Sequence, residues 1–253
     1  MPILNIAAYK FITLNHLPEL QAALLGALQT HGLKGTILLA EEGINLFLAG
    51  PASSVHAFLT WLREDERLAD LEVKESYSAK QPFRKLLVKI KPEIIRMNHP
   101  AIQPAAWRAP AIDAHTLKRW LDAGHDDAGR PVVTLDTRND FEVDVGSFKN
   151  AIDWRISRFS QFPQALLAHR VALLDKTVVS FCTGGIRCEK AAIYMREAGV
   201  QNVYQLEGGI LKYFELQGQA HFEGHCFVFD QRRALDPALR PKVSEASDQA
   251  VQT

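Results

Sequence analysis

The sequence has few cysteines and no long apolar run. Its three cysteines among 253 residues include no metal-type C-x-x-C pair, which argues for reduced thiols rather than a disulfide framework. No apolar stretch is long enough to span a bilayer, and residues 1–5 lack the basic and apolar segments of a signal peptide. The formal net charge is zero, so any contact with nucleic acid or membrane must use a local patch. We therefore expect a cytoplasmic protein with no membrane partner.

The N-terminal part of the chain follows a β-α-β-β-α-β order. Leu17, Leu20, Leu24 and Leu28 form a helical stripe between two β-type segments. The turn at residues 41–43 between two further apolar runs predicts a hairpin. This order is typical of a ferredoxin-like or acylphosphatase-like α+β domain, which we place at residues 1–95. The expected elements are strands at 3–12, 36–40 and 44–49, helices at 15–31 and from 51, and extended segments at 71–77 and 84–91.

The pattern changes after a proline-containing linker. Residues 96–124 hold this linker and a lead-in helix that begins at the N-cap Asp113 and ends at Gly124. Short apolar strands then alternate with helices over residues 125–220, which predicts an α/β domain with a parallel sheet flanked by helices. We expect residues 221–240 to form an extended tail packed on the body, and 241–253 a disordered terminus. The expected strands of the second domain are 132–136, 151–154, 178–182 and 203–206.

One cysteine stands in a distinctive setting. An apolar run leads into Cys182, and two glycines, Arg187 and a helical pattern follow, which predicts strand, tight loop and helix. The N–H groups of such a loop stabilise an anion, and a nearby arginine lowers the pKa of a cysteine. The alternative is a structural cysteine buried at a strand end, which the glycines and the arginine in register disfavour. We therefore predict a reactive Cys182 with Arg187 as its partner, in a loop made of Thr183, Gly184, Gly185 and Ile186.

The cysteine loop, residues 182–187, resembles the active-site loop of rhodanese-like domains. Four residues separate Cys182 from Arg187, whereas cysteine phosphatases use five, so the shorter loop suits a persulfide sulfur. Residues 136–151 and 206–210 resemble the opening and closing motifs of the same domain. In that family the Asp and Arg of the opening motif support the loop. The expected supporting cluster of salt bridges and caps consists of Asp136, Arg138 and Glu142.

Three runs, at residues 35–45, 182–190 and 226–230, occur together in one order. Their combination resembles the oxygen-dependent tRNA uridine hydroxylases over residues 1–235. The resemblance implies tRNA as the partner, molecular oxygen as co-substrate and 5-hydroxyuridine at the first anticodon position as product. No pattern indicates a flavin, a haem or an iron site, so we expect no cofactor and no metal. The alternatives are a sulfurtransferase that carries a persulfide on Cys182, and a tRNA- or partner-binding module with a vestigial loop.

The residues also suggest a mechanism. Uracil is electron-poor at C6, where a thiolate can add and make C5 nucleophilic. We hypothesise that Cys182, as a thiolate or a persulfide, is this nucleophile, and that Arg187 and the loop amides hold its negative charge. Cys188, on the first turn of the helix, either resolves an oxidised Cys182 through a disulfide or is a small buried helix residue. Cys226 is expected to be structural.

A one-sided basic stripe lies near residue 90. In an extended segment, Lys85, Lys89 and Lys91 share one face while apolar residues occupy the other. Such a stripe in a neutral protein is suited to phosphate contacts with RNA. Lysines also keep the solvated face of an edge strand from aggregating. The sequence leaves both interpretations open.

Overall fold

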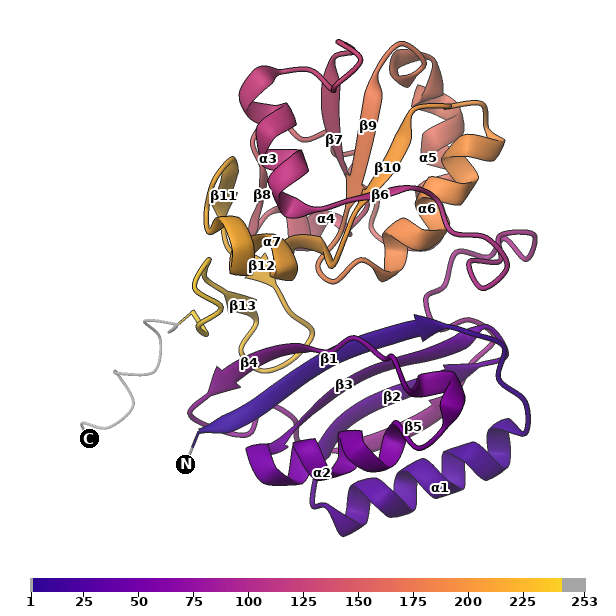
Figure 1. Ribbon diagram of the computed structural model, residues 1–253, viewed down its shortest axis with the longest axis vertical. Coiled ribbons are helices and arrows are strands. Elements are labelled where there is room, and N and C mark those ends of the chain that lie inside the picture. The colour runs from indigo at the N-terminus through magenta and orange to yellow at the C-terminus, as the bar shows by residue number, and fades with distance from the viewer. Residues whose placement is uncertain (1, 243–253) are drawn as a thin grey trace.

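The computed structural model describes residues 2–242. Its N-terminal domain is a five-stranded sheet in the order β4-β1-β3-β2-β5, with α1 and α2 packed on one face (Figure 1). The expected α+β architecture is confirmed, and the extended segment expected at 84–91 contains β5, which pairs in parallel with β2 at the sheet edge. The elements are β1 (Ile3–Phe11), α1 (Leu17–Thr30), β2 (Lys34–Ala40), β3 (Gly43–Pro51), α2 (Ala52–Leu62), a 3-10 turn (Glu66–Leu68), β4 (Lys74–Ser78) and β5 (Leu86–Ile90).

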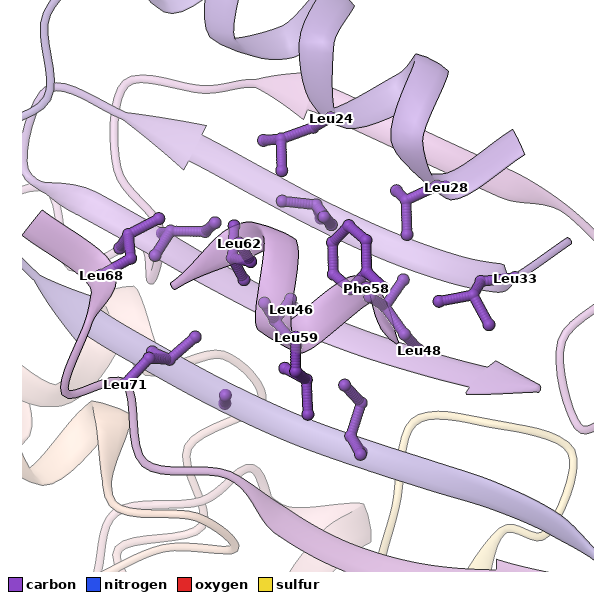
Figure 2. Close-up of a cluster of buried hydrophobic side chains, with 14 of the residues drawn as sticks. Leu24, Leu28, Leu33, Leu46, Leu48, Phe58, Leu59, Leu62, Leu68 and Leu71 are labelled. Carbon is purple, nitrogen blue, oxygen red and sulfur yellow. The ribbon is translucent and has the colours of Figure 1, made fainter. Parts of the chain in front are cut away.

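The core of this domain lies between the sheet and its two helices. Leu24 and Leu28 from α1 meet Phe58 and Leu62 from α2 over the sheet, and all four side chains are buried (Figure 2). Alternate residues of each strand therefore serve this core, and the intervening residues face the other way. That second face looks towards the C-terminal domain (Figure 1), and it carries Tyr9, which hydrogen-bonds Glu189 of that domain.

The second domain contains a four-stranded parallel sheet in the order β6-β10-β9-β7. Asp113 caps α3 as expected, accepting a 2.7 Å hydrogen bond from the N–H of Thr116, and Gly124 ends the helix in the left-handed region. The elements are β6 (Ala111–Ile112), α3 (Ala114–Ala123), β7 (Val132–Asp136), α4 (Asp140–Val143), β8 (Gly146–Phe148), α5 (Phe162–His169), β9 (Thr177–Phe181), α6 (Ile186–Glu197), β10 (Val203–Leu206) and α7 (Gly209–Gln217), with 3-10 turns at Phe159–Gln161 and Arg170–Leu173.

The strand expected at residues 151–154 is wrong. Only Ile152 pairs with the sheet, through a single bridge to Leu135. Beyond it the chain turns away, because Arg155 adopts a left-handed conformation with a φ of 52° and its N–H bonds the Asp153 carboxylate. Residues 151–154 therefore pack against the sheet as a loop and do not add a strand to it.

The last described segment ties the two domains together. It forms β11 (Phe222–Gly224), which pairs with β8, and the small ribbon β12 (Cys226–Phe227) with β13 (Ala234–Leu235). Between these strands the chain reaches the N-terminal domain, where the N–H of Gln231 bonds the carbonyl of Pro82 and Arg232 bonds Ser76.

The disordered terminus expected at 241–253 is wrong for its first two residues. Pro241 forms an isolated bridge with Leu235, and the N–H of Lys242 bonds the carbonyl of Ala234. The rest of that segment, residues 243–253, lies outside the described part of the chain. Among residues 2–242, none of the helices combines the length and apolar character needed to cross a membrane.

Candidate active site

Cys182 lies at the carboxyl end of β9, where the sheet meets the N-terminus of α6. Every residue of β9 is buried, so the strand is a fixed support for the loop that follows. Gly185 adopts a φ of +104°, and its N–H points back to the Cys182 sulfur at 3.1 Å. A side chain at this position is disfavoured both by the backbone conformation and by Tyr9, whose Oη lies 2.8 Å from where a Cβ would stand. The glycine thus lets the loop close around the sulfur.

The surroundings of Cys182 favour its thiolate. Burial alone raises the pKa of this thiol, but a hydrogen bond from Cys188, the charge of Arg187 and the N–H groups of Arg187 and Gly185 act against it. Together they lower the pKa of Cys182 to about 6. The sulfur is therefore largely ionised at neutral pH, as a nucleophile requires.

Arg187 is held rigidly by a carboxylate from another element. Its two terminal nitrogens donate to the two oxygens of Glu142 at 2.7 and 2.8 Å, and both side chains are buried. The Nε of Arg187 has no hydrogen-bond partner among residues 2–242, although it is buried. The guanidinium lines the space beside Cys182, so one of its donors remains free for a ligand.

Asp136 and Arg138 lie beneath the loop rather than beside the sulfur. Their fully buried side chains form a bidentate pair at 2.9 and 2.6 Å, and Asp136 also accepts a hydrogen bond from Ser147. Arg138 in turn donates to the carbonyl oxygens of Glu142 and Gly146. This arrangement fits the supporting role that the sequence suggested, because the pair fixes the segment that carries Glu142.

The other two cysteines are neutral thiols. Burial raises the pKa of Cys188, and the neighbouring Cys182 raises it further, so Cys188 keeps its proton. Its sulfur also lies 3.7 Å from the Thr137 hydroxyl. Burial raises the pKa of Cys226 to about 12.

The cysteine loop faces the N-terminal sheet across a cleft with a cavity volume of about 80 Å³, which is open to solvent. Cys182, Thr183, Gly184 and Arg187 form one wall, and the second face of the N-terminal sheet forms the opposite wall. The tail closes one side with Phe229, whose ring is 52% exposed and lies under the Arg187 guanidinium at 5.9 Å. From the sheet come Asn5, Tyr9, Asn45, Phe47, Lys74 and Ser76.

Both halves of the chain match known domain families. Residues 3–94 match the UPF0176 acylphosphatase like domain, and residues 113–216 match the Rhodanese-like domain. A protein named tRNA uridine(34) hydroxylase from Variovorax paradoxus (strain S110) is 66% identical over 250 residues, which cover 99% of this chain and 95% of the relative. One of the same name from Bordetella petrii is 66% identical over 239 residues, covering 94% and 95% respectively.

The chain belongs to the tRNA uridine(34) hydroxylase family. This confirms the resemblance drawn from the three sequence runs, and it makes the chain an enzyme of the oxidoreductase class. The rhodanese-like domain is confirmed as well. The roles of individual residues rest on the geometry above.

Contacts between the two domains set the shape of the site in this tRNA uridine(34) hydroxylase family member. Lys190, on α6, has a side chain only 2% exposed and bonds both Glu42 and Glu93 at 2.7 Å. Tyr9 bonds Glu189 at 3.2 Å on the same helix. Because α6 starts at the cysteine loop, these contacts also fix the loop against the N-terminal sheet.

The structure does not bring the basic stripe to Cys182. Lys85, Lys89 and Lys91 are exposed on and beside the edge strand β5, outside the cleft. Lys89 pairs with Leu38, which pairs with the cleft residue Asn45, so these three share one sheet face. The stripe therefore borders the same face that forms the cleft wall.

Sequence reasoning missed the cleft residues of the N-terminal domain. Tyr9 and Lys74 belong to strands whose local pattern shows only alternation, and their importance arises from docking against the other domain. Phe229 lies within the run 226–230 that carried the resemblance, but no role was assigned to it. No local signal distinguishes these positions from ordinary sheet and tail residues.

Proposed function

We propose that this enzyme hydroxylates C5 of the wobble uridine of tRNA in the cytoplasm, with molecular oxygen as co-substrate, to give 5-hydroxyuridine. The observation that carries the proposal is the position of Cys182 in the wall of the inter-domain cleft, within a loop that lowers its pKa, in a chain that is 66% identical to named tRNA uridine(34) hydroxylases. Cys182 is the proposed nucleophile, and Arg187 and the loop N–H groups hold its charge.

The first chemical step uses only this chain and the substrate. The Cys182 thiolate adds to C6 of uracil and forms an S–C6 bond, while the C5=C6 π electrons move towards C4 and leave an enolate. C5 is then nucleophilic and takes up oxygen. Conversion of one C5–H, with one O₂, to C5–OH and water also consumes two protons and two electrons, for which a thiol reductant in solution is the proposed source. Loss of the C5 proton and expulsion of Cys182 restore the aromatic ring and the thiolate.

The cleft suits a single extruded base. The chemistry takes place at a base edge, so the base must leave its stack to reach Cys182. An anticodon base is already unpaired in a loop, which lowers the free-energy cost of this extrusion. The exposed ring of Phe229 offers a stacking surface at the side of the cleft, and Asn5 and Asn45 offer amide groups for the polar edge.

The basic stripe provides a path for the phosphate backbone. It borders the face that forms the cleft wall, and Lys85, Lys89 and Lys91 point to solvent. Replacing all three by Ala should weaken tRNA binding and flatten the slope of log affinity against log salt by about one for each phosphate that these lysines neutralise. If this variant keeps the wild-type affinity and salt slope, the three lysines do not contact RNA and only solvate the edge of the sheet.

The function is tested by incubating purified enzyme with unmodified tRNA under ¹⁸O₂ and analysing the nucleosides by mass spectrometry. We expect one labelled oxygen at position 34, none in the Cys182→Ser variant, and normal product in the Cys226→Ala control. Label from water alone would refute the oxygen-dependent reaction, and product from Cys182→Ser would refute the nucleophile. Sulfur transfer from thiosulfate without any tRNA product would instead support the sulfurtransferase alternative.

A further inference from the structure

Among the described residues of the N-terminal sheet that line the cleft, Lys74 is the only lysine or arginine. It is the first residue of β4, paired with Ala7 of β1, and it lines the cleft opposite Cys182. A Cβ added at Gly184 would lie 4.0 Å from its Cδ, so its stem passes directly over the cysteine loop. Its ammonium lies 5.5 Å from the centre of the Tyr9 ring.

This lysine has no acidic or hydrogen-bonding partner. Among residues 2–242 its half-buried side chain makes no hydrogen bond and no ion pair, and its ammonium makes a cation–π contact with the Tyr9 ring. Burial lowers the pKa of Lys74, and the charge of Lys212 adds to this effect against that of Glu72, Cys182 and Glu215. By contrast, the more deeply buried Lys190 is compensated by two carboxylates. A partly desolvated cation without a carboxylate partner, in a cleft, is a recognised mark of a functional group.

We propose that the Lys74 ammonium donates a hydrogen bond to O4 of the target uracil and stabilises the enolate that forms when Cys182 adds to C6. This inference rests on the proposed function and on Cys182 as its nucleophile. As the S–C6 bond forms, negative charge moves through C5 and C4 to O4, on the far side of the ring from the attacking sulfur. Lys74, whose stem lies over the cysteine loop, meets this charge, and the charge returns to the sulfur when the S–C6 bond breaks.

The surroundings favour a uracil oxygen over a backbone phosphate. Lys74 lies in the cleft with Cys182, whereas the lysines proposed for the phosphate backbone, Lys85, Lys89 and Lys91, lie outside it. A carbonyl oxygen is neutral on arrival and becomes negative only during the reaction. A cation placed for that moment lowers the barrier rather than the dissociation constant of the substrate.

Hydrogen exchange at C5 tests the inference without oxygen. Reversible addition of Cys182 lets the enolate pick up a solvent proton at C5 and lose the original one, so anaerobic incubation in D₂O should place deuterium at C5 of uridine 34. At saturating tRNA, Lys74→Met should slow both this exchange and aerobic hydroxylation by about 10²–10³-fold, with KM little changed. Lys74→Arg should recover part of both rates.

The matched control is Lys212→Met, which removes a nearby charge that lies outside the cleft and is paired with Glu215. Its exchange and hydroxylation rates should both match those of the wild type.

Two results for Lys74→Met would overturn the inference. A higher KM with an unchanged exchange rate at saturating tRNA would assign Lys74 to a phosphate, and unchanged kinetics would leave it without a role in the reaction. Wild-type hydroxylation without any C5 exchange would also overturn it while leaving the function intact. Wild-type enzyme that makes no 5-hydroxyuridine would refute the function itself. Thermal melting verifies that each variant is folded.

Discussion

Replacing Cys188 by Ala should shift the titration of Cys182. A hydrogen bond from the Cys188 thiol is one cause of the fall in the pKa of Cys182 to about 6. A hydrogen bond to a charged group contributes about 1.5–3 kcal/mol, and because S–H is a weak donor we take the lower end. Loss of about 1.5 kcal/mol raises a pKa by about one, to about 7 for Cys182.

The consequence is measurable as a rate. At pH 6, about half of the Cys182 side chains are thiolate in the wild type and about one tenth in Cys188→Ala. Alkylation by iodoacetamide at pH 6, followed by peptide mass spectrometry at Cys182, should therefore be about fivefold slower in the variant. Above about pH 8.5 the two proteins should react at similar rates, since both are then ionised. The neutral Cys226 provides an internal reference in each sample.

Cys188→Ser is the matched control, because a hydroxyl also donates a hydrogen bond. Its alkylation profile should stay close to that of the wild type. An unchanged profile in Cys188→Ala would show that Arg187 and the loop N–H groups alone set the titration of Cys182. An equal shift in Ala and Ser would point to altered packing and would refute the hydrogen-bond explanation.

Four other measurements probe the domain contacts and the cysteine loop. Lys190→Met leaves two carboxylates facing each other and should reduce the free energy of unfolding by about 3–5 kcal/mol in urea titrations; a change within error would refute its role in domain docking. Glu142→Gln removes the partner of buried Arg187 and should reduce the free energy of unfolding by a similar amount. It should also alter the rate of Cys182 alkylation. Gly185→Ala, forced to a φ of +104°, should turn its N–H from the sulfur and raise the pKa of Cys182, read from the same alkylation profile. The lowered pKa of Cys182 contributes stability that is full above about pH 9 and is lost as the pH falls through about 6, so this dependence should be absent from melting curves of Cys182→Ser.

Features set by local sequence were predictable. The β-α-β-β-α-β order, the caps Asp113 and Gly124, and the placement of Cys182 between a buried strand and a helix all follow from short-range patterns. The supporting position of Asp136 and Arg138 followed from the motif resemblance, and their burial agrees with it.

Features set by long-range packing were not predictable. The parallel pairing of β5 with β2 joins segments that are far apart in the chain, and the run at 151–154 meets the sheet at one residue only. Tyr9 and Lys74 gain their places in the cleft only when the two domains dock. Periodicity reports which side of a strand is buried, but not which surface covers it.

The return of the chain to its first domain has a consequence for the substrate. After completing the second domain, the backbone comes back to bond Pro82 and Ser76, while Lys190 joins the two domains at a separate place. Because the domains are fastened at both places, opening the cleft widely for a folded anticodon arm would break these contacts. We therefore expect the RNA to take up the distortion that recognition needs. Nucleotides on either side of the wobble position that ease this bending should govern which tRNAs react fastest, even where no side chain touches them.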